Sequence, residues 1–503
     1  MLELLLAAGP LAPALVGAAL LAWPLVGLPW EERHERGVAR AAALALLVTV
    51  AADAAWVALT LGGGPTTHTF GRWLDLPRVA WALSADLPLA AVALVLALAS
   101  VGAVRFALTY MHREARFAKF LGGLLLFAGA MQLLVLGASP ALTFLGWEVA
   151  GGCSALLIAY RTERPAAVAG GLRALITNRV GDAAFLLALG LWAADRGSLD
   201  WAEAASVARE APAVPFLLVV AAAAKSAQLP FTPWIARAME GPTPSSTLFY
   251  GAAMVHAGLV LLLRAEPMLA LSAGAAATAA GLGLLTAALA GLSALAQPDV
   301  KGGLVQATVA QVGLGFVGVA LGLPGWAALH LCAHALVRGI QFLLSPSFLT
   351  DLAGDRNTPV PAWLAARGGW QRAARERFYL EALHEAAIAA PLRQLAAGLA
   401  HLDDRVVERL SGQPGGACAQ PADPDTGAAV DGRGFAVAST VRVAAAVEVI
   451  EELLVGRFIG EGLPRGTGRV GATLDGLERR LAQPWVIAVV VAIGIGLAFG
   501  STP

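Results

Sequence analysis

Long apolar runs separated by short polar segments fill the first two thirds of the chain. A run of about 20 apolar residues can cross the hydrocarbon core of a membrane as a helix. The pattern therefore predicts an all-α polytopic membrane protein with about twelve transmembrane helices. The connection Thr66–Arg78 is short enough for a hairpin. The predicted spans lie at 3–28, 40–62, 83–110, 118–137, 141–160, 167–194, 213–231, 246–264, 269–295, 302–323, 326–347 and, isolated at the end, 484–500.

The stretch before the last predicted span breaks this pattern. Residues 376–412 place apolar and charged positions at helical spacing, which is typical of a helix that lies along a surface. A Gly/Pro/Asp-rich linker at 412–434 and a second amphipathic stretch at 435–460 follow. We therefore expect three parts: a transmembrane core at 1–348, an amphipathic segment with a flexible linker at 349–483, and a C-terminal transmembrane helix at 484–503.

The composition agrees with a membrane protein and excludes several other classes. Hydrophobic residues make up 58% of the chain and charged residues only 14%, whereas a soluble domain carries about 25% charged residues. The net charge is zero, and no basic run suggests a nucleic-acid partner. Cys153, Cys332 and Cys418 are too far apart to predict a disulfide framework or a metal cluster. Leu2–Leu28 lacks a basic leader and a cleavage site, so we interpret it as a retained membrane helix.

Basic residues in the short loops predict the orientation, because such residues favour the cytoplasmic side. Nine lie in odd-numbered loops and four in even-numbered loops, which places the N-terminus outside and the segment after the eleventh span inside. The odd-loop residues are Arg33, Arg36, Arg40, Arg105, Arg113, Arg116, Lys119, Arg161 and Arg164; the even-loop residues are Arg72, Arg78, Arg196 and Arg209.

Ionisable side chains inside predicted membrane helices are the main candidates for function, because each is costly unless it is paired, hydrated or functional. Glu148 lies in the fifth span; the alternative is a carboxylate that reaches the headgroups. Lys225 lies deep in the seventh span, in a chain with only two other lysines. An ammonium can lose its proton when buried, whereas a guanidinium in practice cannot. The alternative for Lys225 is a fixed structural ion pair.

A helix break is predicted directly after Lys225, at Gln228-Leu229-Pro230. Proline removes a backbone hydrogen bond and clashes with the preceding turn. Broken membrane helices are tolerated where they line a cavity. A titratable amine beside such a break is what an ion path needs.

His330, His334 and Arg338 are four residues apart in the eleventh span, so they share one helix face. Two histidines at this spacing can bind zinc, but no third ligand stands nearby. Within a membrane, the row more naturally belongs to a polar axis, since neutral imidazole both accepts and donates a proton.

Other charged groups have structural alternatives. His256 in the eighth span is either a hydrogen-bonded core histidine or a proton site. Arg179 and Asp182 in the sixth span are three residues apart and are expected to form a structural ion pair. Lys301 lies at the mouth of the tenth span, where it either extends to the headgroups or admits protons. No catalytic, cofactor or metal motif stands out, so the pattern favours proton or cation translocation.

Four stretches together resemble a known family: FLGWE, ERPAAVAGGLRALITNRVGDAAFLLALG, AKSAQLPFTPWIARAMEGPTPSS and the HxxxHxxxR row. They are similar to the antiporter-like subunits of energy-converting complexes, above all the L subunit of bacterial NADH:quinone oxidoreductase, which is subunit 5 in mitochondria. Mrp cation antiporters, membrane hydrogenases and the membrane partner of the DAB inorganic-carbon uptake system share this domain. The similarity spans about 80–348, and the stretch from Glu376 resembles the start of the L subunit's lateral helix.

The resemblance implies roles for the matching residues. Glu148 matches the glutamate that pairs with the lysine of a broken helix 7, here Lys225, and His330 and His334 continue the same hydrated axis. It also implies other membrane subunits as partners, protons or Na⁺ as the ion, a bacterial inner membrane, no cofactor in this chain and no active site of its own. The driving reaction lies elsewhere in such complexes.

Three departures from the family keep alternatives open. Arg338 stands where the family has lysine, and Tyr250 stands where the L subunit has a histidine, with His256 nearby. The helices expected after the eleventh are missing. The alternatives to a proton-translocating complex-I-like subunit are therefore the membrane partner of a large zinc-containing DAB-type subunit, an Mrp-like antiporter subunit, and a non-conducting scaffold.

Overall fold

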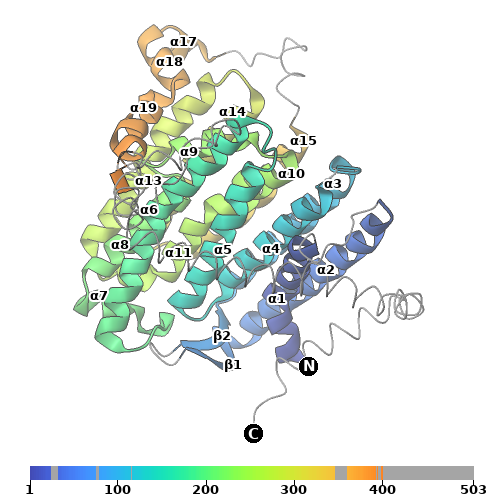
Figure 1. Ribbon diagram of the computed structural model, residues 1–503. Helices are drawn as coiled ribbons and strands as arrows, with labels where there is room; N and C mark the ends of the chain where they lie inside the picture. Colours follow the sequence, from blue (N-terminus) through green and yellow to red (C-terminus); the bar gives the residue numbers. More distant parts are fainter. Residues whose placement is uncertain are drawn as a thin grey trace, which may run out of the picture. The chain divides into compact units, whose positions relative to one another are not determined.

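The computed structural model describes residues 1–23, 32–74, 79–114, 116–345 and 360–391, together with 394, 398 and 399. Met1–Pro391 form one compact unit, whose elements are shown in Figure 1. The predicted linker at 412–434, the amphipathic stretch at 435–460 and the helix at 484–500 lie outside the described residues.

The predicted membrane helices are present in the described part of the chain. Ten helical stretches are long and apolar enough to cross a membrane, and α8 is a shorter apolar helix. They account for all eleven spans predicted in the first 347 residues. The ten stretches are α1 (Leu2–Ala22), α2 (Glu32–Gly63), α3 (Leu87–Tyr110), α4 (Phe117–Leu136), α5 (Pro140–Ile158), α6 (Pro165–Arg196), the stretch Thr243–Arg264, α13 (Ala273–Ala296), α14 (Val300–Ala320) and α15 (Pro324–Leu344); the shorter α8 is Ala213–Lys225.

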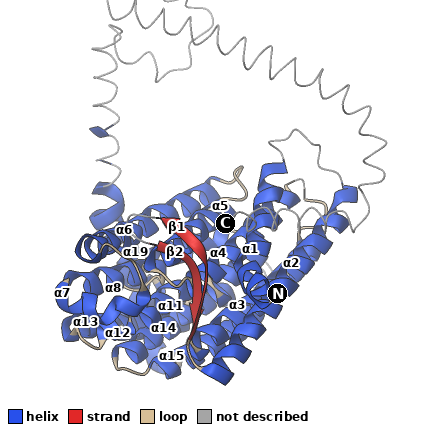
Figure 2. Ribbon diagram, turned by 90° about the horizontal axis from the view of Figure 1, so that it is seen from below, coloured by secondary structure: helices blue, strands red, loops and turns tan. Residues whose placement is uncertain are grey.

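The connection after α2 forms the hairpin that its length allows. β1 (Thr66–Leu74) and β2 (Val79–Ala85) pair antiparallel, with Thr66 opposite Ala85. The third span starts later than predicted, at Leu87 rather than residue 83, because β2 continues to Ala85 and Asp86 caps the helix. The Asp86 carboxylate accepts a hydrogen bond from the Leu89 backbone N–H at 2.9 Å. Figure 2 shows the two strands lying across the ends of the helices.

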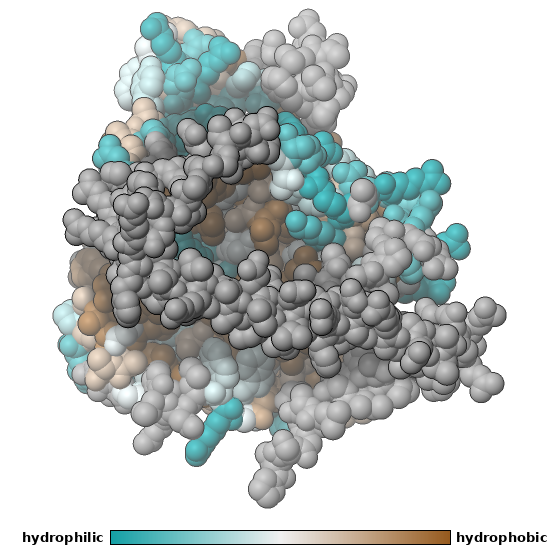
Figure 3. Space-filling view, in the orientation of Figure 1, coloured by the Kyte–Doolittle hydropathy of each residue, from teal (hydrophilic) through white to brown (hydrophobic). Residues whose placement is uncertain are grey.

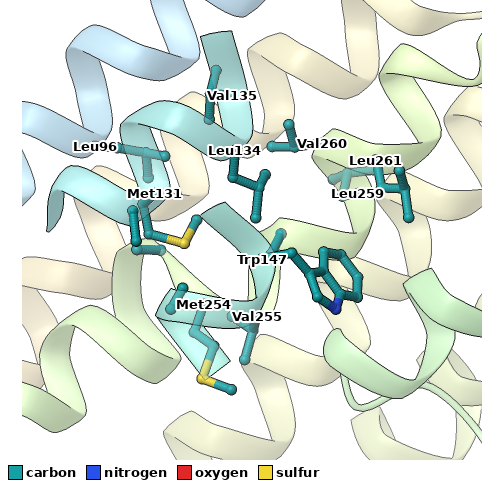
Figure 4. Close-up of a cluster of buried hydrophobic side chains, with 14 of the residues drawn as sticks. Leu96, Met131, Leu134, Val135, Trp147, Met254, Val255, Leu259, Val260 and Leu261 are labelled. Carbon is teal, nitrogen blue, oxygen red and sulfur yellow. The ribbon is translucent and has the colours of Figure 1, made fainter. Parts of the chain in front are cut away.

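The helix α4 lies at the centre of the unit, and most of its residues are buried. Glycines let its neighbours approach closely: a Cβ on Gly146 of α5 would lie 2.5 Å from the Ala130 carbonyl oxygen of α4. Figure 4 shows the apolar cluster in which α3, α4 and α5 meet the segment from Met254 to Leu261. Such close packing holds polar groups at fixed positions between the helices.

The segment that follows α8 is irregular. Short elements replace a continuous eighth helix, including a π-helical turn, a feature often found at functional sites. The elements are α9 (Pro233–Arg237), η3 (Ala238–Glu240), α10 (Thr243–Ser246), η4 (Thr247–Ala252, π-helical), η5 (Met254–His256) and α11 (Ala257–Arg264). Three further short elements, η2 (Trp201–Glu203), α7 (Ala204–Glu210) and α12 (Glu266–Leu269), connect the longer helices.

The amphipathic segment is not the uninterrupted helix predicted from residue 376. It consists of α17 (Ala362–Ala365), α18 (Gly368–Arg375), η6 (Arg377–Tyr379), α19 (Leu380–His384) and η7 (Glu385–Ala389). The three residues of η6 have left-handed φ values of 51°, 53° and 57°. This turn places Phe378 against the apolar cluster of Ala296, Leu364 and Ala374, so packing on the bundle overrides the helical pattern.

The two ends of the unit differ in the elements that they carry. Figure 1 shows α17 and α18 at one end and the strands β1 and β2 at the other. In Figure 3 hydrophilic residues gather at the end with α17 and α18, and hydrophobic surface lies between the two ends. This distribution fits helices that cross an apolar layer.

Candidate ion-translocation site

Lys225 is the last residue of α8, and only 1% of it is exposed. Its Nζ lies 3.7 Å from Oδ1 of Asp182 and 4.8 Å from the centre of the Trp147 ring. Among the described residues, Nζ has no hydrogen-bond partner. The indole N–H of Trp147 donates to the same Asp182 oxygen at 2.6 Å. Trp147 thus contacts the ammonium through its ring face and fixes the nearest carboxylate through its N–H.

Arg179 joins two carboxylates beside Lys225. Its Nη2 lies 2.8 Å from Oε2 of Glu148 and 2.9 Å from Oδ2 of Asp182. This differs from the direct Glu148–Lys225 pair that the family resemblance implies. The reason is geometric: α6 lies against both α5 and α8, so Arg179 reaches Glu148 while Asp182 faces the ammonium. The Arg179–Asp182 pair is part of a four-residue network rather than isolated.

Gly151 of α5 provides the space that the ammonium occupies. A Cβ on Gly151 would lie 2.6 Å from Nζ of Lys225, which is closer than real Cβ contacts come. The neighbouring Gly152 has open space where a Cβ would lie. The glycine pair therefore has one member that faces the network and one that does not.

The chain leaves the helix directly after Lys225, three residues before the predicted break at Gln228. The amide of Gln228 donates to the Ser226 carbonyl oxygen at 2.9 Å and to the Val309 carbonyl oxygen at 3.3 Å. The Leu229 backbone N–H donates to the Thr286 hydroxyl at 3.0 Å. Side chains thus satisfy backbone groups that the helix would otherwise pair, which such a break requires within a membrane. Pro230 and the residues to Thr232 lead into α9.

The histidines form a second cluster. Nε2 of His256 lies 2.9 Å from Nδ1 of His334, and Nε of Arg338 donates to Nε2 of His334 at 3.4 Å. His330 stacks on His334 with ring centres 6.0 Å apart and lies 3.1 Å from the Gln311 carbonyl oxygen. His256 is 1% exposed, so it is the buried end of the row. The row on α15 therefore continues onto η5 through His256.

The two clusters lie on elements that touch. A Cβ on Gly258, two residues after His256, would overlap the Ala222 carbonyl oxygen and the Ser226 hydroxyl. The start of α11 therefore packs directly on the end of α8. The network at the end of α8 and His256, the buried end of the histidine row, thus lie on adjoining elements, as the polar groups of an ion path would.

Lys301 stands apart from both clusters. It lies at the start of α14, and its Nζ donates to the Thr243 hydroxyl at 3.1 Å. On the same side of the bundle, a cavity of about 20 Å³ lies beside the helix break, large enough for one water molecule. Thr232, Gln306, Arg377 and Glu381 are among its lining residues.

Several site residues escaped the sequence analysis. Trp147 and Gly151 are apolar or small, so nothing in their composition marks them. Asp53 in α2 is a fully buried carboxylate, and the signal for it was present in the stretch VTVAADAAW, an acid in an apolar run. Within the described residues, no group of three or more His, Cys, Asp or Glu could hold a metal ion.

Comparisons with known proteins agree with this geometry. Residues 139–359, which contain both clusters, match the family described as NADH:quinone oxidoreductase/Mrp antiporter, TM. The NADH-ubiquinone oxidoreductase chain 5 of Cryphonectria parasitica is 33% identical over 62% of this chain and 49% of its own length. That of Pongo abelii is 35% identical over 50% of this chain and 42% of its own length. The part of the chain that holds both clusters is therefore similar to the antiporter-like membrane proteins of this family.

Solved structures support the same fold. A chain of the Mrp complex from Dietzia sp. DQ12-45-1b is 26% identical and matches with a TM-score of 0.58, over 68% of this chain and 37% of that chain. A chain of an archaeal membrane-bound sulfane sulfur reductase, 20% identical with a TM-score of 0.55, shares the fold. The protein spans about half the length of the curated relatives that it matches.

Proposed function

We propose that this chain is a proton-translocating, antiporter-like membrane subunit of a complex-I-like assembly, in which a reaction on other subunits drives proton movement. The observation that carries the proposal is Lys225: a buried amine that has no hydrogen-bond partner within the described part of the chain, at the end of a broken helix, beside carboxylates that share one arginine. An amine in this setting can exist in both charged and neutral forms, which a proton relay requires.

A charge count explains how the network would respond to its surroundings. Glu148, Asp182, Arg179 and protonated Lys225 sum to zero formal charge. When Lys225 releases its proton, one negative charge remains among apolar helices, which is unfavourable. A positive charge arriving near Glu148 would compensate it and favour release. Arg179 exposes 48% of its side chain, so a neighbouring subunit would have access to the network from that side. The presence of a positive charge near Glu148 and the presence of the proton on Lys225 are thereby coupled.

The histidine cluster would carry the proton onward. His256 and His334 are within hydrogen-bond distance, so one ring can donate while the other accepts. Arg338 supplies a fixed charge beside them rather than a relay, because a guanidinium does not release its proton.

The orientation follows from the loop charges. We infer that the N-terminus and the hairpin face the outside of a bacterial inner membrane, and that α17–α19 face the cytoplasm. Single cysteines at Thr67 and Trp370 test this in intact cells: a membrane-impermeant thiol reagent should modify the first and leave the second unmodified. The reverse pattern would contradict the orientation.

The central test measures proton movement in the native assembly. Lys225→Ala and Glu148→Gln should each abolish coupled proton transport while the complex still assembles. Unchanged transport in both variants would reject the proposal. A flux that depends on Na⁺ and ignores the proton gradient would instead support an Mrp-like antiporter.

Identifying the companions separates the remaining alternatives. Gentle purification from native membranes followed by mass spectrometry should recover other membrane subunits and a redox module. Recovery of one large zinc-binding protein alone would instead indicate an inorganic-carbon uptake system, an alternative that neither the relatives nor the geometry favours.

A further inference from the structure

We propose a second proton-binding site at Asp53, separate from Lys225 and the histidines and reached from the end of the bundle that carries β1 and β2. Asp53 lies ten residues before Gly63, the last residue of α2. At 1.5 Å per residue this is about 15 Å, or half of a hydrocarbon core of about 30 Å. The carboxyl group is therefore near the middle of the membrane layer.

The surroundings of Asp53 favour a neutral acid over a carboxylate. The residue is 0% exposed, and neither carboxyl oxygen has a hydrogen-bond partner among the described residues. Gln132 of α4 is a neighbouring polar side chain, and its Nε2 donates to the Ala93 carbonyl oxygen at 3.0 Å. An ionised carboxylate that is buried without a partner is costly, and a proton on Asp53 removes that charge.

A proton fits the site better than a metal cation does. A hard cation would need several oxygen ligands around it. Among the described residues, no group of three or more His, Cys, Asp or Glu side chains is placed to hold a metal ion. A proton needs no such shell of ligands.

Polar side chains lie between the turn of α2 that carries Asp53 and the hairpin end of the bundle. Trp56 lies one helical turn further along the same face of α2, and its ring meets His68 of β1 with centres 5.5 Å apart. Nε1 of Trp56 and Nε2 of His68 are buried without partners. Nδ1 of His68 lies 4.0 Å from Oε1 of Glu3, whose side chain is 72% exposed. Glu3 and His68 are thus the titratable groups between the solvent and Asp53.

The site is distinct from the proposed transport axis. Lys225, Glu148 and Asp182 lie on α5, α6 and α8, whereas Asp53 lies between α2 and α4. A failure of proton transport through Lys225 would therefore leave this proposal standing, and the reverse also holds.

Labelling by a hydrophobic carbodiimide tests the site on the unmodified full chain in lipid vesicles, since this reagent reacts with protonated carboxyl groups in apolar surroundings. We expect peptide mapping to find the adduct at Asp53, with a yield that falls at least tenfold from about pH 6 to about pH 9. Glu148, which pairs with Arg179, serves as an internal reference and should react less. Asp53→Asn should lose the adduct.

Three results would overturn the proposal. Absence of the adduct at every pH would show that Asp53 is not a protonated acid. A yield that does not change with pH would show a permanently neutral structural group. Suppression of the adduct by Na⁺ at constant pH would show a metal-cation site. The path is tested separately: His68→Gln should slow the infrared response of the Asp53 carboxyl group to a pH jump, and an unchanged rate would exclude entry through the hairpin.

Discussion

Gly151 shows how a residue without chemistry of its own can control a charged group. Because a Cβ there would lie 2.6 Å from Nζ of Lys225, Gly151→Ala should push the ammonium away from Asp182 and Trp147. Because Nζ is the far end of a flexible side chain, it can move aside at little cost in stability, so the expected effect is on transport. We expect proton transport to fall about tenfold or more in vesicle assays of the intact assembly.

Gly152→Ala is the matched control, since open space surrounds the position where its Cβ would lie. Both variants add the same methyl group to adjacent positions of α5 and raise helix propensity equally. Equal transport in the two variants would show that Gly151 does not position Lys225.

The residue scale also shows what the sequence could and could not predict. Lys225, Glu148 and the histidine row were recognisable because ionisable groups are rare in apolar runs. Their partners were not, since the contacts of Asp182 and Trp147 depend on which helix faces which. Hydropathy predicts which residues form membrane helices, but it does not predict which helices pack against one another. Glycine spacing likewise does not reveal which of two adjacent glycines faces a charge.

At the scale of elements, the broken helix depends on side chains that replace its lost backbone bonds. The Thr286 hydroxyl accepts from the Leu229 backbone N–H, so Thr286→Val should leave that buried donor unpaired. An unsatisfied buried donor costs about 1–3 kcal/mol. A lower midpoint of thermal unfolding in lipid nanodiscs would report this loss.

Thr278→Val on the same helix supplies the comparison. Both hydroxyls donate to the carbonyl oxygen four residues earlier, at 2.6 Å for Thr286 and 2.8 Å for Thr278, but Thr278 is solvent- or lipid-facing and supports no break. Its substitution should change stability by no more than about 0.5 kcal/mol. Similar losses in both variants would mean that the Leu229 contact contributes little.

The amphipathic segment should dock in a pH-dependent manner. His384 of α19 is buried and lies 3.0 Å from the Thr177 hydroxyl of α6. Burial, and then the nearby Arg173 charge, lower the pKa of His384 below its ordinary value. Docking therefore favours the neutral ring. The contribution of neutral His384 to the free energy of docking is complete above about pH 6.5. It is lost as the pH falls toward the lowered pKa of His384.

Hydrogen exchange of residues 380–389 measures this docking. Exchange corrected for its intrinsic pH dependence should accelerate below about pH 6.5 in the natural protein. His384→Gln, which cannot gain a charge, should remove the acceleration. The ion pairs from Glu381 to Arg173 and Arg237, at 3.3 and 2.6 Å, remain in both proteins. Acceleration of the same size in the variant would assign the effect to another group.

These elements also mark a limit of sequence patterns. The apolar runs predicted the helices of the core. The third span nevertheless begins later than predicted, because its first predicted residues belong to β2 and to the Asp86 cap. The amphipathic pattern from residue 376 predicted a helix, whereas packing against α13 produced a left-handed turn at Arg377–Tyr379. Local periodicity cannot include the surface on which a segment docks.

At the scale of the whole molecule, the last described membrane helix has an unusual surface. The helix α15 exposes Leu329, Val337 and Ile340, at 69%, 57% and 57%. The half-buried Arg338 lies directly beside this apolar face. An arginine at the edge of a lipid-facing surface is costly, whereas a protein neighbour can supply polar partners. We therefore expect another membrane protein to cover this face.

A photoreactive amino acid at Val337 tests this expectation in native membranes. The adduct should be a second membrane protein of the same assembly, identified by mass spectrometry. The same probe at Leu284 of α13, which is 62% exposed, compares another exposed position away from the polar row. Lipid adducts alone at Val337 would mean that Arg338 meets the bilayer directly. In that case the histidine row would end at the lipid, and proton transfer beyond it would have to proceed within this chain.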